Sequence, residues 1–178
     1  MRDIALIGRA RSGKDTVGAR LVERFGYTRL AFADPLKEMA LEINPWIPTG
    51  YGVVVRLHRL IADVGWDYAK ENYPEVRRIL QHTGQSIRHR TPDYWVRALL
   101  DTAYKVPSGP IVVTDVRYKN EAHALQRHGF RLVRLVRPGT EEMTHTSETE
   151  LEEIDTPLRI VNSGTLEDLR AHADTLPF

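Results

Sequence analysis

The chain has 178 residues, of which 42% are hydrophobic and 28% are charged. This length and composition are typical of one compact globular domain and exclude a wholly disordered chain. The 25 basic and 24 acidic side chains leave a formal net charge of +1. Such a balance excludes a strong overall attraction to nucleic acid or to an anionic membrane, so any recognition of phosphate must be local.

The sequence contains no cysteine, which excludes disulfides, thiolate zinc sites and a cysteine nucleophile. No apolar run approaches the roughly 20 residues that cross a bilayer. The first apolar run, Ile4–Ile7, is too short for the core of a signal peptide. We therefore expect a cytoplasmic protein with no membrane and no nucleic-acid partner, and a homodimer remains open.

The first part of the chain alternates between strand and helix patterns. Residues 4–7 form a continuous apolar run that predicts a buried parallel strand, and the apolar spacing over 13–25 predicts a helix. A second strand is expected at 27–32. Asp34 and Pro35 are typical of a helix start, and that helix is expected to end near residue 43, before a proline-bearing stretch.

The middle of the chain has a mostly helical pattern from about residue 53 to residue 105. Pro74 and Pro92 are expected helix starts, because proline is well tolerated in the first turn. The segment 84–91 has no clear assignment. The pattern predicts an all-helical region between the second and the third strand.

The last part of the chain returns to short strands separated by helices. Five strands that alternate with helices favour an α/β fold, in which a five-stranded parallel sheet is covered by helices on both faces. The last three strands are expected at 111–114, 131–136 and 158–161, and the helices at 119–128 and 165–173.

Residues 8–14, Gly-Arg-Ala-Arg-Ser-Gly-Lys, form a candidate phosphate-binding loop. The motif lies between a predicted strand and a predicted helix, which is the context that such a loop requires. Consecutive backbone N–H groups and the helix N-terminus attract phosphate oxygens, and Lys14 is expected to reach the β and γ phosphates. A chance glycine turn ahead of a helix is the alternative.

The residue after this lysine departs from the usual pattern. Asp15 replaces the serine or threonine that normally binds Mg²⁺, and a hydroxyl comes one position later at Thr16. The metal is then expected to be held by Asp15, through water, or by nucleotide oxygens alone. The Lys-x-Thr order resembles that of nucleoside monophosphate kinases such as adenylate kinase.

Polar residues after the second strand and on a predicted helix are candidates for binding a second ligand. Lys37 lies where a parallel sheet places its ligand-facing loops. Gln81, Gln85 and Arg88 are spaced at i, i+4 and i+7, which places two amides and a guanidinium along one helical stripe. An ordinary solvated surface is the alternative for Lys37 and for this stripe.

Two charged residues come at the end of the predicted strand 111–114. Asp115 is suited to take an acceptor proton or to hold Mg²⁺ through water, and Arg117 is suited to bridge phosphates. Arg137 precedes a polar segment, about 138–155, that contains His145, Ser147 and Glu148. We expect this segment to be a lid that closes Arg137 over the reacting phosphate, with an ordinary loop as the alternative.

Several of these segments together resemble the bacteriophage deoxynucleoside monophosphate kinases, whose members share Arg-Ser-Gly-Lys-Asp-Thr as found at 11–16. The Lys-Asp-Thr departure is thus a mark of the family. The resemblance spans most of the chain, although residues 45–75 lie outside it. The other similar segments are 32–37, 80–88, 92–96, 115–122 and, more weakly, 145–148.

The resemblance implies Mg²⁺-dependent transfer of the γ-phosphoryl of ATP to a deoxynucleoside 5′-monophosphate, in the host cytoplasm if a phage encodes the chain. It implies a three-layer phosphate-loop kinase fold with a core of 1–43 and 106–178, a helical acceptor-binding insertion at about 44–105 and the lid. The implied ATP-binding residues are Arg11, Ser12, Gly13, Lys14, Asp15, Thr16, Asn162 and Gly164; the implied acceptor-binding residues are Lys37, Gln85, Arg88 and Trp95; and Lys14, Asp115, Arg117 and Arg137 are implied to be catalytic.

Three other functions remain open at this stage. The first is another small-molecule kinase of the same architecture, acting on dephospho-coenzyme A or on phosphomevalonate. The second is a regulator that binds ATP without turnover. The third is a nucleic-acid-binding protein, which the net charge of +1 and the lack of a contiguous basic stripe disfavour.

Overall fold

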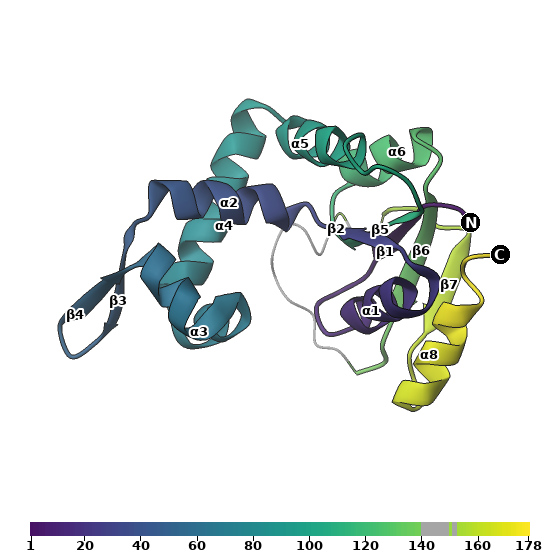
Figure 1. Ribbon diagram of the computed structural model, residues 1–178, viewed down its shortest axis with the longest axis horizontal. Helices are drawn as coiled ribbons and strands as arrows, with labels where there is room; N and C mark the ends of the chain where they lie inside the picture. The colour runs from purple at the N-terminus through teal and green to yellow at the C-terminus, as the bar shows by residue number, and fades with distance from the viewer. Residues whose placement is uncertain (140–149, 151–152) are drawn as a thin grey trace. The chain divides into compact units, whose positions relative to one another are not determined.

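The structure, a computed structural model, describes residues 1–139, Glu150 and residues 153–178 (Figure 1). His145, Ser147, Glu148 and most of the expected lid at 138–155 lie outside the described residues. The chain divides into two compact units. Unit 1 comprises Met1–Phe32 and Val96–Phe178, and unit 2 comprises Ala33–Trp95.

Unit 1 is built on a five-stranded sheet in the order β2-β5-β1-β6-β7, and all of its strand pairs are parallel. The α/β prediction is therefore confirmed. Strand β5 continues two residues beyond the predicted end and includes Asp115. The strands are β1 (Ile4–Ile7), β2 (Thr28–Leu30), β5 (Ile111–Val116), β6 (Arg131–Val136) and β7 (Leu158–Val161).

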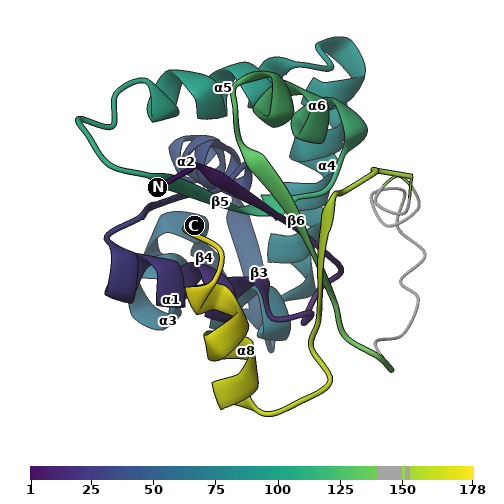
Figure 2. The same ribbon diagram turned by 90° about the vertical axis from the view of Figure 1, so that its right-hand side faces the viewer.

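Helices cover both faces of this sheet. Helices α1 and α8 lie against one face, and α5 and α6 lie against the other (Figures 1 and 2). The first two residues of α5 belong to unit 2. The bounds are α1 (Lys14–Phe25), α5 (Tyr94–Ala103), α6 (Lys119–Arg127) and α8 (Leu166–Asp174).

The main core of unit 1 fills the space between the sheet and the α1–α8 layer. Successive side chains of a strand point to opposite faces, so alternate residues of each strand enter this core. Ile4 and Leu6 of β1, for example, pack with Val17 and Leu21 of α1. The continuous apolar runs of the sequence therefore mark strands that are buried on both faces.

A charged contact also joins α1 to α8. Arg20 donates two hydrogen bonds to Asp174, with its Nε 2.8 Å from Oδ1 and its Nη2 2.9 Å from Oδ2. Arg24 contacts the same carboxylate. These guanidinium groups lower the pKa of Asp174, mainly through the hydrogen bonds from Arg20.

Unit 2 contains three helices and a β-hairpin. The expectation of a purely helical region is wrong at its start, because β3 and β4 form an antiparallel pair. Positive φ angles at Gly50, Tyr51 and Gly52 make the turn, and the β-branched run that follows suits a strand. The elements are α2 (Ala33–Ile43), β3 (Trp46–Gly50), β4 (Val53–Arg56), α3 (Leu57–Asn72) and α4 (Pro74–Arg90).

The boundaries of unit 2 differ from the insertion expected at about 44–105. Unit 2 begins with α2, whose residue Ala40 packs with Leu57, Leu60 and Val76 in a core of its own. Most of α5 belongs instead to unit 1. Helix α4 runs without a break to Arg90, so the unassigned segment 84–91 is almost entirely helical.

Within the described part of the chain, no helix combines the length and the apolar character needed to cross a membrane.

Candidate functional site

The carboxyl ends of the parallel strands gather the candidate residues of unit 1. Open α/β sheets bind ligands at this edge, because the loops that follow the strands all emerge there. Gly8 follows β1, Arg137 follows β6 and Asn162 follows β7, while Asp115 lies near the end of β5. The sheet topology therefore brings residues from four separate sequence segments to one edge.

The loop between β1 and α1 has the curled backbone that its glycines predict. Gly13 has φ 103° and Arg11 has φ 61°, so both residues adopt left-handed conformations. The N–H of Ser12 donates to the carbonyl of Arg9 at 3.3 Å. Ser12 is buried and Arg11 is exposed. We refer to residues 8–14 as the phosphate loop.

The Lys14 side chain is held by the carbonyls of its own loop. Its Nζ donates to the carbonyl oxygen of Gly8 at 2.6 Å and to that of Arg9 at 2.7 Å. It also lies 3.5 Å from the hydroxyl of Ser12. Only 7% of Lys14 is exposed. A buried ammonium needs such partners, and the loop thus fixes a positive charge beside the first turn of α1.

The start of α1 provides further donors for an anion. Among the described residues no side chain caps this helix, whereas the hydroxyl of Thr165 caps α8 by accepting from Asp168 N–H. An α-helix begins with amide groups that lack intrahelical partners, and its N-terminus carries a partial positive charge. Amides and an ammonium form a donor set that fits a phosphate chain. Asp15 is exposed and Thr16 is half-buried beside them.

Asn162 connects the end of β7 to the phosphate loop. Its Nδ2 donates to the carbonyl of Ser12 at 3.0 Å, and its backbone N–H donates to the carbonyl of Val136 at 2.7 Å. A Cβ on Gly13 would lie 2.8 Å from that Nδ2 and 2.8 Å from Cδ2 of Leu169. Glycine at position 13 therefore permits both the left-handed backbone and the close approach of Asn162.

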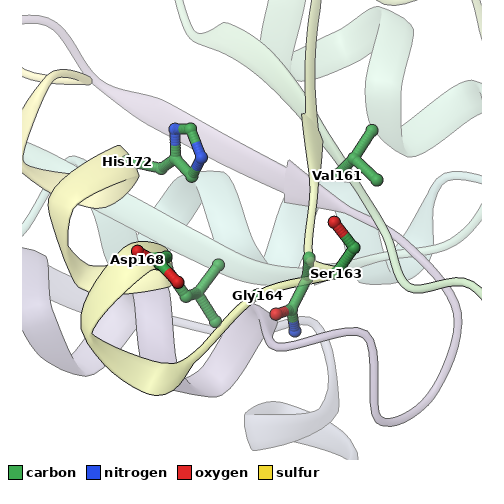
Figure 3. A pocket seen from close by; sticks show the side chains of 7 residues that line it. Val161, Ser163, Gly164, Asp168 and His172 are labelled. Carbon is green, nitrogen blue, oxygen red and sulfur yellow. The ribbon is translucent and has the colours of Figure 1, made fainter.

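A pocket of about 250 Å³ lies beside Asn162, at the turn from β7 to α8 (Figure 3). A Cβ on Gly164 would lie 2.5 Å from Oδ2 of Asp168, so this glycine allows the tight turn. Asp168 Oδ2 accepts from both the N–H and the hydroxyl of Thr165 at 2.8 Å. These hydrogen bonds lower the pKa of Asp168. The pocket is lined by Val161, Asn162, Ser163, Gly164, Asp168, Leu169 and His172.

The Asp115 carboxylate accepts a hydrogen bond from the protein backbone. Its Oδ1 accepts from the N–H of Phe32 at 2.8 Å, which joins β5 to the segment that follows β2. The register of β1 against β5 shifts between Ala5 and Ile7, so β5 has one residue more than β1 at this point. Bulges of this kind commonly re-aim side chains next to active sites.

Arg117 is exposed, and its backbone is fixed by a residue to which sequence reasoning assigned no role. Glu121 accepts through Oε2 from the N–H of Arg117 at 2.9 Å and from the N–H of Tyr118 at 3.1 Å. Only 1% of Glu121 is exposed. A glutamate at the third position of a helix is a typical capping residue, and this was the signal that could have found it. Arg137, directly after β6, is also exposed.

The expected acceptor residues all belong to unit 2. Helices α2 and α4 approach closely at Gly84, where a Cβ would lie 3.3 Å from Cδ2 of Leu36. Lys37 and Gln85 directly follow these two residues in the sequence. Lys37 pairs with Asp34 at 3.5 Å.

The helical stripe of α4 is only partly solvated. Gln81 is exposed, but Gln85 and Arg88 are half-buried. Trp95 is only 2% exposed, and its indole N–H donates to the carbonyl of Gly84 at 3.1 Å. In the structure Trp95 therefore supports α4 next to Gln85, and its ring does not lie on an exposed surface.

No group of three or more His, Cys, Asp or Glu side chains suited to hold a metal ion exists in the described ranges. The metal candidates Asp15 and Asp115 are single carboxylates. A cation bound there would therefore draw most of its ligands from water and from phosphate oxygens.

A glycine-lysine loop between the first strand and the first helix of a parallel sheet defines a phosphate-loop nucleotide-binding protein. Comparison with known proteins extends this result. A family model described as "Deoxynucleotide monophosphate kinase" matches residues 55–173. The chain belongs to this family, and it is a nucleotide kinase and thus a transferase.

Two relatives carry the same description as the family. The putative deoxynucleotide monophosphate kinase of Acanthamoeba polyphaga mimivirus is 28% identical, over 93% of this chain and 90% of that protein. The deoxynucleotide monophosphate kinase of enterobacteria phage T4 is 35% identical over 56% of this chain, and the match spans 44% of the phage protein. Among solved structures, shikimate kinase from Aquifex aeolicus has 14% identity and a TM-score of 0.48, with 96% of this chain and 92% of that chain covered.

Proposed function

We propose that the protein transfers the γ-phosphoryl group of ATP to deoxynucleoside 5′-monophosphates and so forms the diphosphates that serve as DNA precursors. The observation that carries this proposal is the buried Lys14 ammonium, held by the Gly8 and Arg9 carbonyls at the N-terminus of α1. Family membership supports the monophosphate as acceptor. We further propose that the reaction takes place in the cytoplasm.

The phosphate loop is the proposed site of the ATP phosphates. Its amides and the first amides of α1 would bind the phosphate oxygens, and Lys14 would bind the β and γ phosphates. The pocket at the β7–α8 turn is joined to this loop by the hydrogen bond from Asn162 to Ser12. We assign the adenine of ATP to this pocket, beside Asn162 and Gly164.

The monophosphate is the proposed ligand of unit 2. Lys37 and Arg88 supply positive charge for its phosphate, and a guanidinium can bind two phosphate oxygens at once. Gln85 carries an amide that can donate to and accept from a base edge. Trp95 acts indirectly, because its indole holds the carbonyl of Gly84 next to Gln85.

Phosphoryl transfer needs little covalent help from a protein, so positioning and charge neutralisation account for most of the catalysis. Lys14 binds the transferring group, and Arg117 and Arg137, both exposed near the carboxyl edge of the sheet, bind the charge that develops on it. Asp115 is the candidate to accept a proton or to orient a metal-bound water. A Mg²⁺ ion bound with ATP would offset phosphate charge, with Asp15 and Asp115 as its protein-side partners.

The test is a coupled assay of diphosphate formation with dAMP, dGMP, dCMP and dTMP, each with ATP and Mg²⁺. We expect formation of the diphosphate from at least one of the four monophosphates, dependent on both ATP and Mg²⁺. An absence of activity with all four would contradict the proposal. ATP hydrolysis or binding without stimulation by a monophosphate would indicate a nucleotide-binding regulator instead.

A further inference from the structure

Helix α1 lies on strand β5 through an unusually close contact. A Cβ on Gly18 would lie 2.6 Å from Cγ2 of Thr114 and 3.8 Å from its Cβ. Gly18 is buried, and Thr114 is only 3% exposed. Threonine has a stiff χ1 and is enclosed at this position, so a larger residue at position 18 would displace the helix or the strand.

This contact lies one helical turn from the phosphate-loop lysine. Lys14 and Gly18 are spaced at i and i+4 and both are on the buried face of α1. The Lys14 ammonium sits 2.6 Å and 2.7 Å from two loop carbonyls, so a small movement of the helix changes the geometry of these hydrogen bonds. Thr114 in turn directly precedes Asp115, at the point where β5 bulges against β1.

We propose that Gly18 and Thr114 are positioning residues for the kinase reaction. The contact between the glycine and the threonine methyl sets the depth at which α1 lies on β5. It thereby fixes the Lys14 ammonium relative to the phosphate loop. The kinetic consequence of this inference rests on the proposed function, but the consequence for nucleotide binding does not.

The Thr114 hydroxyl allows a test of whether the methyl or the hydroxyl of this residue is responsible for the positioning role. Its oxygen is buried and has no hydrogen-bond partner among the described residues. A valine of the same shape would keep the methyl and remove this unpaired oxygen. If the methyl contact is the operative feature, Thr114→Val should raise the unfolding temperature and should weaken nucleotide binding less than a substitution of Gly18 does.

The main experiment uses Gly18→Ala, Thr114→Ser and the double variant. Alanine favours a helix over glycine, so Gly18→Ala removes no helix propensity, and its added Cβ meets the Thr114 methyl. We expect Gly18→Ala to weaken ADP binding about tenfold in calorimetry, the scale of losing a well-placed charge-assisted hydrogen bond. Thr114→Ser removes the methyl, so the double variant should regain ADP affinity to within about threefold of the unaltered protein. Ala19→Ser, exposed on the same helix, is the matched control and should leave the affinity unchanged.

The outcomes separate the two proposals. An unchanged ADP affinity in Gly18→Ala, or a double variant that binds no better than Gly18→Ala, would overturn the positioning role. If Thr114→Val weakens ADP binding as much as Gly18→Ala does, the hydroxyl and not the methyl is the operative group, and this result would also overturn the proposal. If the unaltered protein forms no diphosphate from any monophosphate, the proposed function fails, and the ADP measurements still decide the positioning role. If the protein is active, kcat of Gly18→Ala should fall about tenfold while the acceptor KM stays constant.

Discussion

The phosphate loop of unit 1 and the candidate acceptor site of unit 2 are built in different ways. In the loop, the candidate donors are mostly backbone amides, and Lys14 is held by two main-chain carbonyls. In unit 2, the candidates are side chains on α2 and α4, which are placed by the packing of Gly84 against Leu36. Under the proposed function, donor recognition would therefore depend on local backbone geometry, whereas acceptor recognition would depend on how two helices pack.

The largest effect on activity is expected from a substitution in the phosphate loop, the proposed donor site. Lys14→Ala should lower kcat at least about 100-fold, because one well-placed charge acts on the transition state. Lys14→Met is the matched variant, since it keeps most of the apolar stem without the charge. Thermal unfolding should show that both variants are folded at the assay temperature, and both should lose turnover. A Lys14→Met protein with a nearly normal rate would break the assignment of the donor site to this loop.

The second largest effect is expected at the proposed acceptor site of unit 2, and it tests acceptor binding separately from donor binding. Arg88→Ala should raise the KM for the monophosphate about tenfold and leave the ADP dissociation constant unchanged, because the guanidinium is assigned to the acceptor phosphate. Arg77→Ala, an exposed position on the same helix, is the control and should change neither value. Equal weakening of ADP and monophosphate binding by Arg88→Ala would remove the distinction between the two halves.

A smaller effect is expected where a side chain supports the loop from a distance. Asn162→Ala removes the hydrogen bond to the Ser12 carbonyl. Losing one hydrogen bond of about 1 kcal/mol corresponds to roughly a fivefold weaker ATP affinity. Calorimetry with ATP and with a monophosphate measures this, and only ATP binding should change. An unaltered ATP affinity would show that the loop holds its shape without Asn162.

The smallest effect concerns stability and its dependence on pH. Arg20 lowers the pKa of Asp174, so the folded state favours the carboxylate more than the unfolded state does. This stabilisation is fully present above the ordinary pKa of an aspartate and is lost as the pH falls through the lowered value. Asp174→Asn should therefore reduce the unfolding temperature at pH 7, and the deficit should shrink in acid. Thermal unfolding between about pH 2 and pH 7 measures this, and a deficit that is constant with pH would contradict it.

The sequence was most informative where structure is local. The runs 4–7 and 111–113 are continuous and apolar because their strands are buried on both faces, and the phosphate loop was located by its glycines and Lys14. The hairpin was missed because Pro48 suggested a break, while the left-handed backbone at Tyr51 leaves no clear signal in the sequence.

Contacts between distant segments could not be predicted. Asn162 meets Ser12 across 150 positions of sequence, and Thr114 meets Gly18 through the packing of a helix on a sheet. Pattern and propensity describe neighbours along the chain, and these contacts depend on the final fold. The burial of Trp95 likewise depends on the final fold and could not be predicted from the sequence. The roles assigned to individual site residues stay predictions until the variants above are measured.

The bond between Asn162 and the phosphate loop also matters for protein engineering. It ties the lining of the β7–α8 pocket directly to the backbone of the proposed phosphate site. On the proposed assignment of adenine to this pocket, a designer who wants a different nucleobase in the donor should vary Ser163 and His172 and leave Asn162 alone. Such libraries would test whether the preferred nucleoside triphosphate can be changed while the proposed phosphate site is kept.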